Sequence, residues 1–154
     1  MENSVIEHRY ITLDCAKLLK QAGFHDLIKT WCHKTYSDER PDVSIWTSDR
    51  PEDHNELPEE KNHYKVYSCP TQAQACKWIR DNFNIHVEVT WTYNNDPAVT
   101  GDLSTVYVVC VNSPVSSLDI FETFDGDYEE AMDYGILLAL KEIIKRKENG
   151  NQGK

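Results

Sequence analysis

The segment TQAQACKWIRDNFNIHVEVTWTY, residues 71–93, constrains the fold more than any other part of the chain. Thr71 followed by Gln74 three positions later is the capping-box pattern of a helix start. The apolar residues after it recur with helical spacing, and Asn84 suits a left-handed helix end. Residues 85–93 then alternate apolar and polar side chains, as in a half-buried strand. The segment therefore predicts a helix joined directly to a strand.

Two further segments carry helix signals. Thr12 is a suitable cap and Gly23 a suitable stop for a short amphipathic helix between them. Asp127 and Glu130 repeat the capping pattern before residues 128–146, whose apolar face is broad. Three helices are therefore expected.

The intervening segments are rich in aromatic and β-branched residues, which favours strands. The expected strands cover residues 28–36, 42–48, 85–93 and 103–112, with a further edge strand within 113–124. Residues 103–112 are apolar on both faces, which suits a central strand. The order α-β-β-α-β-β-(β)-α predicts an α+β domain with three helices on a mainly antiparallel sheet of about four to five strands.

The 154 residues fit a single domain, expected over residues 1–147. Within it, residues 49–62 (DRPEDHNELPEEKN) are dominated by acids and contain two prolines, which predicts an acidic exposed loop. Residues 148–154 are expected to form a disordered tail.

The net charge is -10, which disfavours double-stranded nucleic acid as a partner because such binding draws on Lys and Arg at the phosphates. A protein partner, including a basic one, is favoured instead. The densest basic cluster falls at the end of the last predicted helix, where cations favour the helix dipole; it comprises Lys141, Lys145, Arg146 and Lys147.

Five cysteines without a C-x-x-C pair are typical of a reducing compartment. The N-terminus lacks a signal-peptide pattern, and no apolar stretch approaches the ~18 residues of a membrane span. We therefore expect a cytoplasmic protein without membrane association.

Three segments resemble a widespread group of small uncharacterised proteins encoded in prophages and other mobile elements of gut-dwelling anaerobic bacteria. They are LLKQAGF at 18–24, TQAQACKWIRDNFNIHVEV at 71–89 and YEEAMDYGILLALKEII at 128–144. The acidic segment has no counterpart in that group. The resemblance implies a mobile-element context, and it implies no functional residues because the group has no assigned activity.

Cys69 is the best candidate nucleophile, because it precedes Pro70 at a predicted helix start and helix N-termini lower thiol pKa values. His63 and His86 are its candidate partners. No nucleophile signature surrounds Cys69, and free cysteines are usually small buried hydrophobes. A small thiol-dependent or hydrolytic enzyme is therefore an alternative hypothesis, and no catalytic residue is assigned.

Metal sites are also weakly indicated. The nearest grouping is His25, Cys32 and His33, but neighbouring residues of a strand point to opposite faces and zinc-site spacings are missing. The acids between residues 119 and 133 are better explained by a helix start than by a calcium loop, since the loop's glycine and terminal Glu are absent. No metal and no cofactor are predicted.

The favoured function is a non-catalytic protein-binding module with an acidic surface. Its candidate binding residues are Asp49, Glu52, Asp53, Glu56, Glu59, Glu60, Trp46, Tyr64 and Tyr67. A second alternative is a single-stranded nucleic-acid binder that stacks bases on sheet aromatics. Trp78 and Trp91 are expected to lie in the core.

Overall fold

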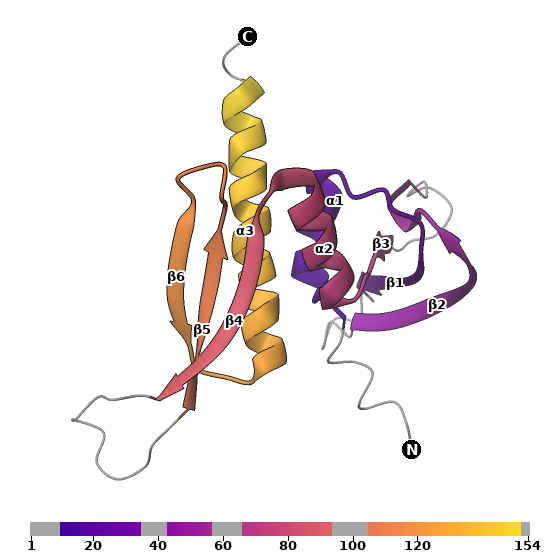
Figure 1. Ribbon diagram of the computed structural model, residues 1–154. Coiled ribbons are helices and arrows are strands. Elements are labelled where there is room, and N and C mark those ends of the chain that lie inside the picture. The colour runs from indigo at the N-terminus through magenta and orange to yellow at the C-terminus, as the bar shows by residue number, and fades with distance from the viewer. Residues whose placement is uncertain (1–9, 35–42, 57–65, 94–104, 152–154) are drawn as a thin grey trace.

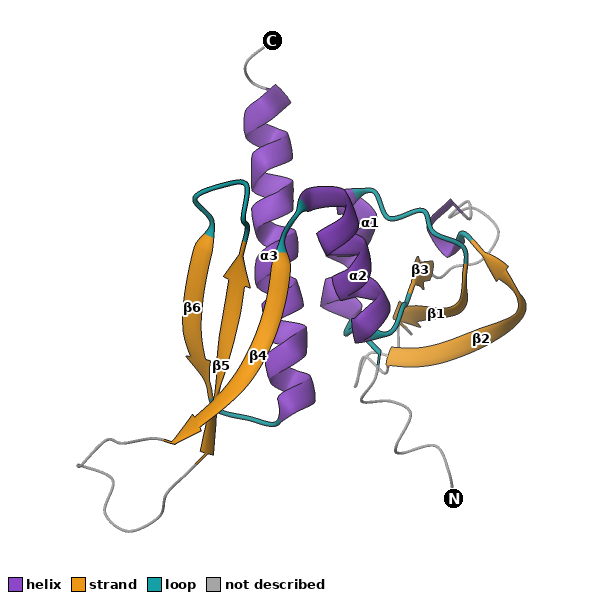
Figure 2. Ribbon diagram, viewed as in Figure 1, coloured by secondary structure: helices purple, strands orange, loops and turns teal. Residues whose placement is uncertain are grey.

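The computed structural model describes residues 10–34, 43–56, 66–93 and 105–151. The elements run in the order α1 (Leu13–Ala22), β1 (Ile28–Lys34), β2 (Val43–Glu52), the short 3-10 helix η2 (His54–Glu56), β3 (Val66–Ser68), α2 (Gln72–Phe83), β4 (His86–Tyr93), β5 (Thr105–Asn112), β6 (Asp119–Phe124) and α3 (Tyr128–Asn151). The predicted α+β class with three helices is confirmed (Figures 1 and 2).

The strands form two antiparallel three-stranded sheets, in the orders β2-β1-β3 and β4-β5-β6. The sequence predicted about four to five strands in one sheet, and the described residues hold six in two. The helices explain the difference. They lie between the two sheets, so each sheet covers a different side of the helical layer (Figure 1). Local alternation along a strand does not encode which sheet the strand joins.

Both short helices begin and end as their sequences predicted. The Thr12 side chain accepts a hydrogen bond from the Cys15 amide, and Gly23 ends α1 with φ 93°. In α2 the Thr71 and Gln74 capping box is complete, and Asn84 ends the helix with φ 52°. These ends are set by hydrogen bonds within a few residues, which is why the sequence alone locates them.

The third helix, α3, packs on one face of the β4-β5-β6 sheet, and β5 is the central strand as predicted. Asp127 accepts a hydrogen bond from the Glu130 amide and Glu130 accepts one from the Asp127 amide, which confirms the predicted helix start. At Gly135, a Cβ atom would lie 2.6 Å from Cγ1 of Val87 and 2.9 Å from Cγ1 of Val109. The absence of a side chain there lets the helix approach the sheet closely.

Contacts between distant segments join the two halves of the molecule. Asp133 of α3 accepts hydrogen bonds from the Thr12 amide at 2.9 Å and the Thr12 hydroxyl at 2.8 Å. Lys147 donates to the Ala22 carbonyl at the C-terminus of α1, so this cation stabilises the end of a neighbouring helix rather than that of its own. One hydrophobic core includes buried residues of all three helices and both sheets.

The region that the sequence predicted as an acidic exposed loop is structured over its first part. The second strand, β2, continues to Glu52, and η2 follows it. Two polar side chains of η2 are buried, His54 at 2% and Asn55 at 6% exposure. Residues 57–62 lie outside the described part of the chain.

At the other end, α3 continues to Asn151, past the expected domain end at residue 147. Over the described ranges, the structure contains no helix that is both long enough and apolar enough to span a membrane.

Candidate functional site

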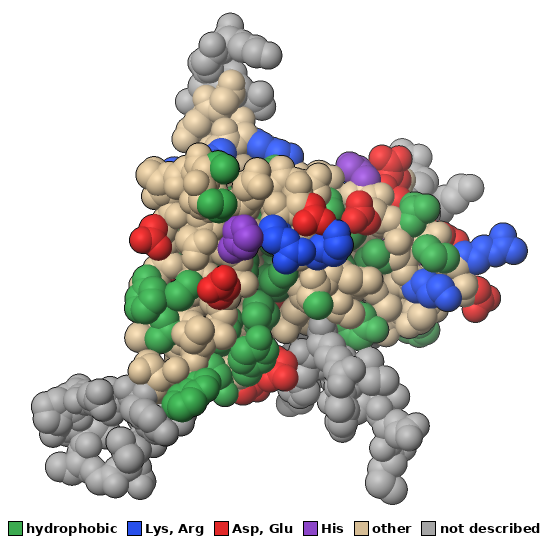
Figure 3. Space-filling model, viewed as in Figure 1, with side chains coloured by type: hydrophobic (Ala, Val, Ile, Leu, Met, Phe, Trp, Pro, Cys, Tyr) green, Lys and Arg blue, Asp and Glu red, His purple; other side chains and the backbone are tan. Residues whose placement is uncertain are grey.

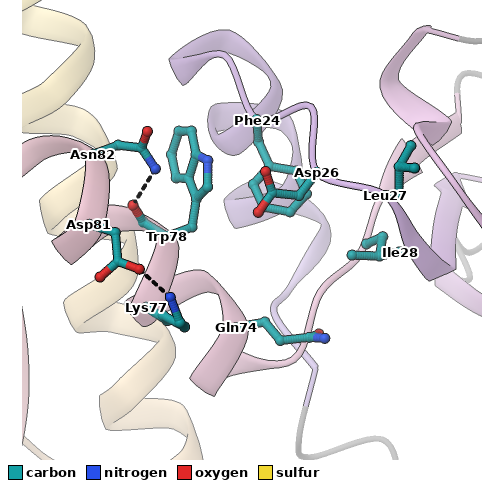
Figure 4. Close-up of a pocket in the computed structure, with 9 residues that line it drawn as sticks. All are labelled: Phe24, Asp26, Leu27, Ile28, Gln74, Lys77, Trp78, Asp81 and Asn82. Atoms are coloured by element: carbon teal, nitrogen blue, oxygen red, sulfur yellow. Dashed lines mark hydrogen bonds and ion pairs between the residues drawn. The ribbon is translucent and has the colours of Figure 1, made fainter.

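A surface groove runs between α2 and residues 24–30. One end is a hollow of about 270 Å³ whose lining includes Phe24, Leu27, Trp78 and Asn82 (Figure 4). An adjoining hollow of about 320 Å³ is lined by residues that include Tyr10, Lys29, Thr71 and Pro51. The two hollows share Leu27, Ile28 and Gln74 in their linings, so they adjoin each other, and we call them together the α2 groove.

The end of α1 builds one wall of this groove. Gly23 turns the chain out of the helix, and Phe24 then enters the core against the Trp78 ring, with ring centroids 5.3 Å apart. Residues 25–27 then run along the surface, and 67% of the Leu27 side chain is exposed. Ile28 returns to the core as β1 begins.

The other wall is the exposed face of α2, which carries charge of both signs (Figure 3). Lys77 donates a hydrogen bond to Asp81, one turn later. That hydrogen bond and the positive charge of Lys77 hold the pKa of Asp81 below its usual value. Asp26 lines the same hollow from the opposite wall (Figure 4). The groove lining thus holds two carboxyl groups, one on each wall, together with the exposed Leu27 side chain.

The structure gives no support to Cys69 as a nucleophile. Its side chain is fully buried, and its sulfur donates a hydrogen bond to the Ile11 carbonyl at 3.4 Å. Hydrogen bonding with Cys32 and burial raise the pKa of the Cys69 thiol far above its usual value. His86 lies on β4, in the β4-β5-β6 sheet, whereas Cys69 follows β3 of the other sheet. His63 lies outside the described residues.

Part of the predicted acidic binding surface is described. Asp49 and Glu52 are exposed on β2, Glu56 is exposed on η2, and Asp53 is half-buried between these two elements. Glu59 and Glu60 fall outside the described residues, as does Tyr64.

The predicted binding aromatics differ in exposure. Trp46 on β2 is 53% exposed and stacks on Trp31, with ring centroids 5.9 Å apart and 15° between the planes. Tyr67 is half-buried, with the Lys20 ammonium 5.5 Å from its ring centroid. Of these two, only Trp46 offers a broad accessible ring surface.

The two tryptophans expected in the core have different environments. Trp78 is 8% exposed, which confirms the expectation, whereas 61% of Trp91 is exposed, so that expectation is wrong. Trp91 pairs with Tyr107, which lies beside Tyr128 at the first residue of α3. Trp91 therefore lies next to the point where α3 begins, at the edge of the sheet face that α3 covers.

The grouping His25, Cys32 and His33 is not assembled as a site. Cys32 is fully buried in the core, whereas the His25 side chain is 56% exposed and contacts Asp53 and Glu56. Nothing is described of the His33 side chain. Sequence reasoning missed this contact, and it also missed Leu27 and Asp81 in the α2 groove. Those residues converge only through the packing of α1, α2 and η2, for which no local pattern exists.

No family model, no curated protein and no solved structure matches the chain. Its function is therefore inferred from the geometry of its own surface.

Proposed function

We propose that the protein is a non-catalytic binding module whose α2 groove holds a basic, partly apolar segment of a protein partner. The observation that carries the proposal is the 67% exposed Leu27 side chain beside Asp26, in a groove that Asp81 lines from the opposite wall (Figure 4). Asp81 is already paired with Lys77, so the Asp26 carboxylate next to Leu27 is the one that suits a peptide with an apolar residue beside Lys or Arg.

The acidic residues of β2 extend this surface. Pro51 lines the second hollow of the groove, and Asp49 and Glu52 are exposed on the same strand. Arg50, exposed between them, offsets part of this negative charge. These charges favour rapid encounter with a basic partner, an effect that salt weakens.

The residue types in the groove lining favour binding over catalysis. Its described lining contains no cysteine, histidine or serine side chain, so the usual nucleophile and base pairing is missing there. With Cys69 buried as well, the thiol-enzyme hypothesis has no supporting geometry among the described residues.

Single-stranded nucleic-acid binding is a second candidate because Trp46 presents a stacked, 53% exposed ring. The net charge of -10 makes it the weaker one. Titration with oligonucleotides at low salt tests it. Quenching of tryptophan fluorescence that is lost in Trp46→Ala favours this candidate, and unchanged fluorescence removes it.

The mobile-element context and a cytoplasmic location stay predictions. Both are compatible with a small module that binds one protein partner.

Selection of random peptides against the full chain tests the proposed function. We expect the selected peptides to combine Lys or Arg with apolar residues, and to bind more weakly as salt is raised from roughly 0.05 to 0.5 M. Leu27→Ser should weaken their binding at least tenfold. Val115→Ser is the matched control, since Val115 is 71% exposed between β5 and β6. Equal binding by both variants would remove the groove as the site.

A further inference from the structure

Three side chains with different ligand chemistry converge beside the α2 groove. The atoms are Nδ1 of His25 and one carboxylate oxygen each of Asp53 and Glu56, all within 4.8 Å of one another. Nδ1 of His25 lies 2.9 Å from Oδ2 of Asp53 and 3.5 Å from Oε1 of Glu56. The cluster thus combines an imidazole from the α1–β1 connection with two carboxylates from the η2 turn.

Buried neighbours fix the position of this cluster. Nε2 of His54 is hydrogen-bonded to the Ile28 carbonyl at 3.0 Å, and Nδ2 of Asn55 donates to the Phe24 carbonyl at 2.9 Å. Those two carbonyls flank His25 in the sequence. Two buried side chains of the turn therefore hold Asp53 and Glu56 against the segment that carries the imidazole, without using any of the three converging atoms.

The three side chains differ in exposure and in the hydrogen bonds that they already make within the protein. Oδ1 of Asp53 accepts a hydrogen bond from the Asn55 amide at 3.0 Å, which leaves Oδ2 directed at His25. The Asp53 side chain is 16% exposed, against 56% for His25 and 71% for Glu56. One side of the cluster is thus anchored in the protein and the other is open to solvent.

The donor set calls for a cation. A neutral imidazole carries at most one hydrogen at Nδ1, so it pairs with one carboxylate and leaves the second, on the 71% exposed Glu56, to solvent. Even imidazolium leaves the cluster with a net negative charge. A divalent metal ion can bind all three atoms at once, and the ligand atoms of tetrahedral zinc lie roughly 3.3–3.4 Å apart when metal–ligand distances are ~2.0–2.1 Å. The separation of 3.5 Å from Nδ1 to Glu56 is close to that value, and the 2.9 Å from Nδ1 to Asp53 has to widen when an ion enters.

We propose that His25, Asp53 and Glu56 form a site for a divalent cation of the zinc class. One imidazole with carboxylates is a donor set that zinc accepts, and three protein ligands leave a coordination position for water on the exposed side. This inference does not depend on the proposed function of the α2 groove.

Titration of the full chain with Zn²⁺ tests the proposal, with calorimetry for affinity and NMR of the histidine ring nitrogens for location. We expect one equivalent to bind and to shift Nδ1 of His25. His25→Gln, Asp53→Asn and Glu56→Gln should each weaken binding at least tenfold. His86→Gln and Glu88→Gln are the matched controls, because both residues lie on β4, away from the cluster, and they should leave affinity unchanged.

The variants are chosen to keep the fold. Asn at position 53 retains an oxygen that can accept from the Asn55 amide, and Glu56 is too exposed for its substitution by Gln to unfold the chain. Zinc that leaves the His25 ring signals unshifted, as when it binds a cysteine sulfur, would overturn the proposal. So would equal affinity of Glu56→Gln and the wild type, which would identify the cluster as a plain ion pair.

Discussion

Asn55→Ala is expected to destabilise the protein strongly, because this side chain connects η2 to two other segments. Asn55 is 6% exposed, its Nδ2 donates to the Phe24 carbonyl at 2.9 Å, and its Oδ1 accepts from the Ser68 amide at 3.0 Å. Truncation to Ala leaves that carbonyl and that amide without these partners. Each unpaired buried group costs about 1–3 kcal/mol, so the loss of both partners should lower the free energy of unfolding by about 2–6 kcal/mol.

Urea denaturation followed by tryptophan fluorescence measures this change. Asn82→Ala is the control, since Asn82 is an exposed residue of α2 whose side chain donates only to the nearby Trp78 carbonyl, and its effect should stay within about 0.5 kcal/mol. If Asn55→Ala costs no more than Asn82→Ala, the turn is not held by these hydrogen bonds. Asp53 and Glu56 would then be held in place by other contacts.

Two further predictions concern the helix packing and the buried thiols. Gly135→Ala should be less stable than Gly150→Ala by about 1–3 kcal/mol in the same urea assay, because an added methyl meets two valines at position 135 and nothing within 4 Å at position 150. Equal stabilities would refute the close helix–sheet contact. Burial raises the pKa of the Cys76 thiol from 9.0 to about 11, so the unfolded state loses this proton first and stability should fall between pH 9 and 11. Cys76→Ala should reduce that slope by up to ~1.4 kcal/mol per pH unit, and an unchanged slope would contradict the assignment.

The parts of the fold that the sequence predicted are those fixed by local hydrogen bonds and periodicity. Thr71, Gln74 and Asn84 determine where α2 begins and ends through contacts within a few residues. The alternation in β4 likewise follows from which face of one strand is covered. The interactions that determine these helix ends and this alternation involve residues close together in the sequence.

The features that the sequence did not predict depend on contacts between segments that are distant in the chain. His54 and Asn55 lie in a run of acids and prolines, so composition favoured an exposed loop, and only their bonds to Ile28 and Phe24 bury them. Trp91 continues the apolar side of β4, yet it is 61% exposed because the cover from α3 ends there. The separation of the strands into two sheets has the same origin, since it includes the pairing of β1 with β3, which lie far apart in the sequence.

Amide NMR shifts of the full chain on addition of a selected peptide distinguish the proposed α2 groove from the other surfaces. We expect the largest shifts on residues 26–28 and 74–82, on both walls of the groove, and we expect them to be absent in Leu27→Ser. Shifts that concentrate around Trp46, or on the β4-β5-β6 sheet, with the groove unperturbed, would contradict it.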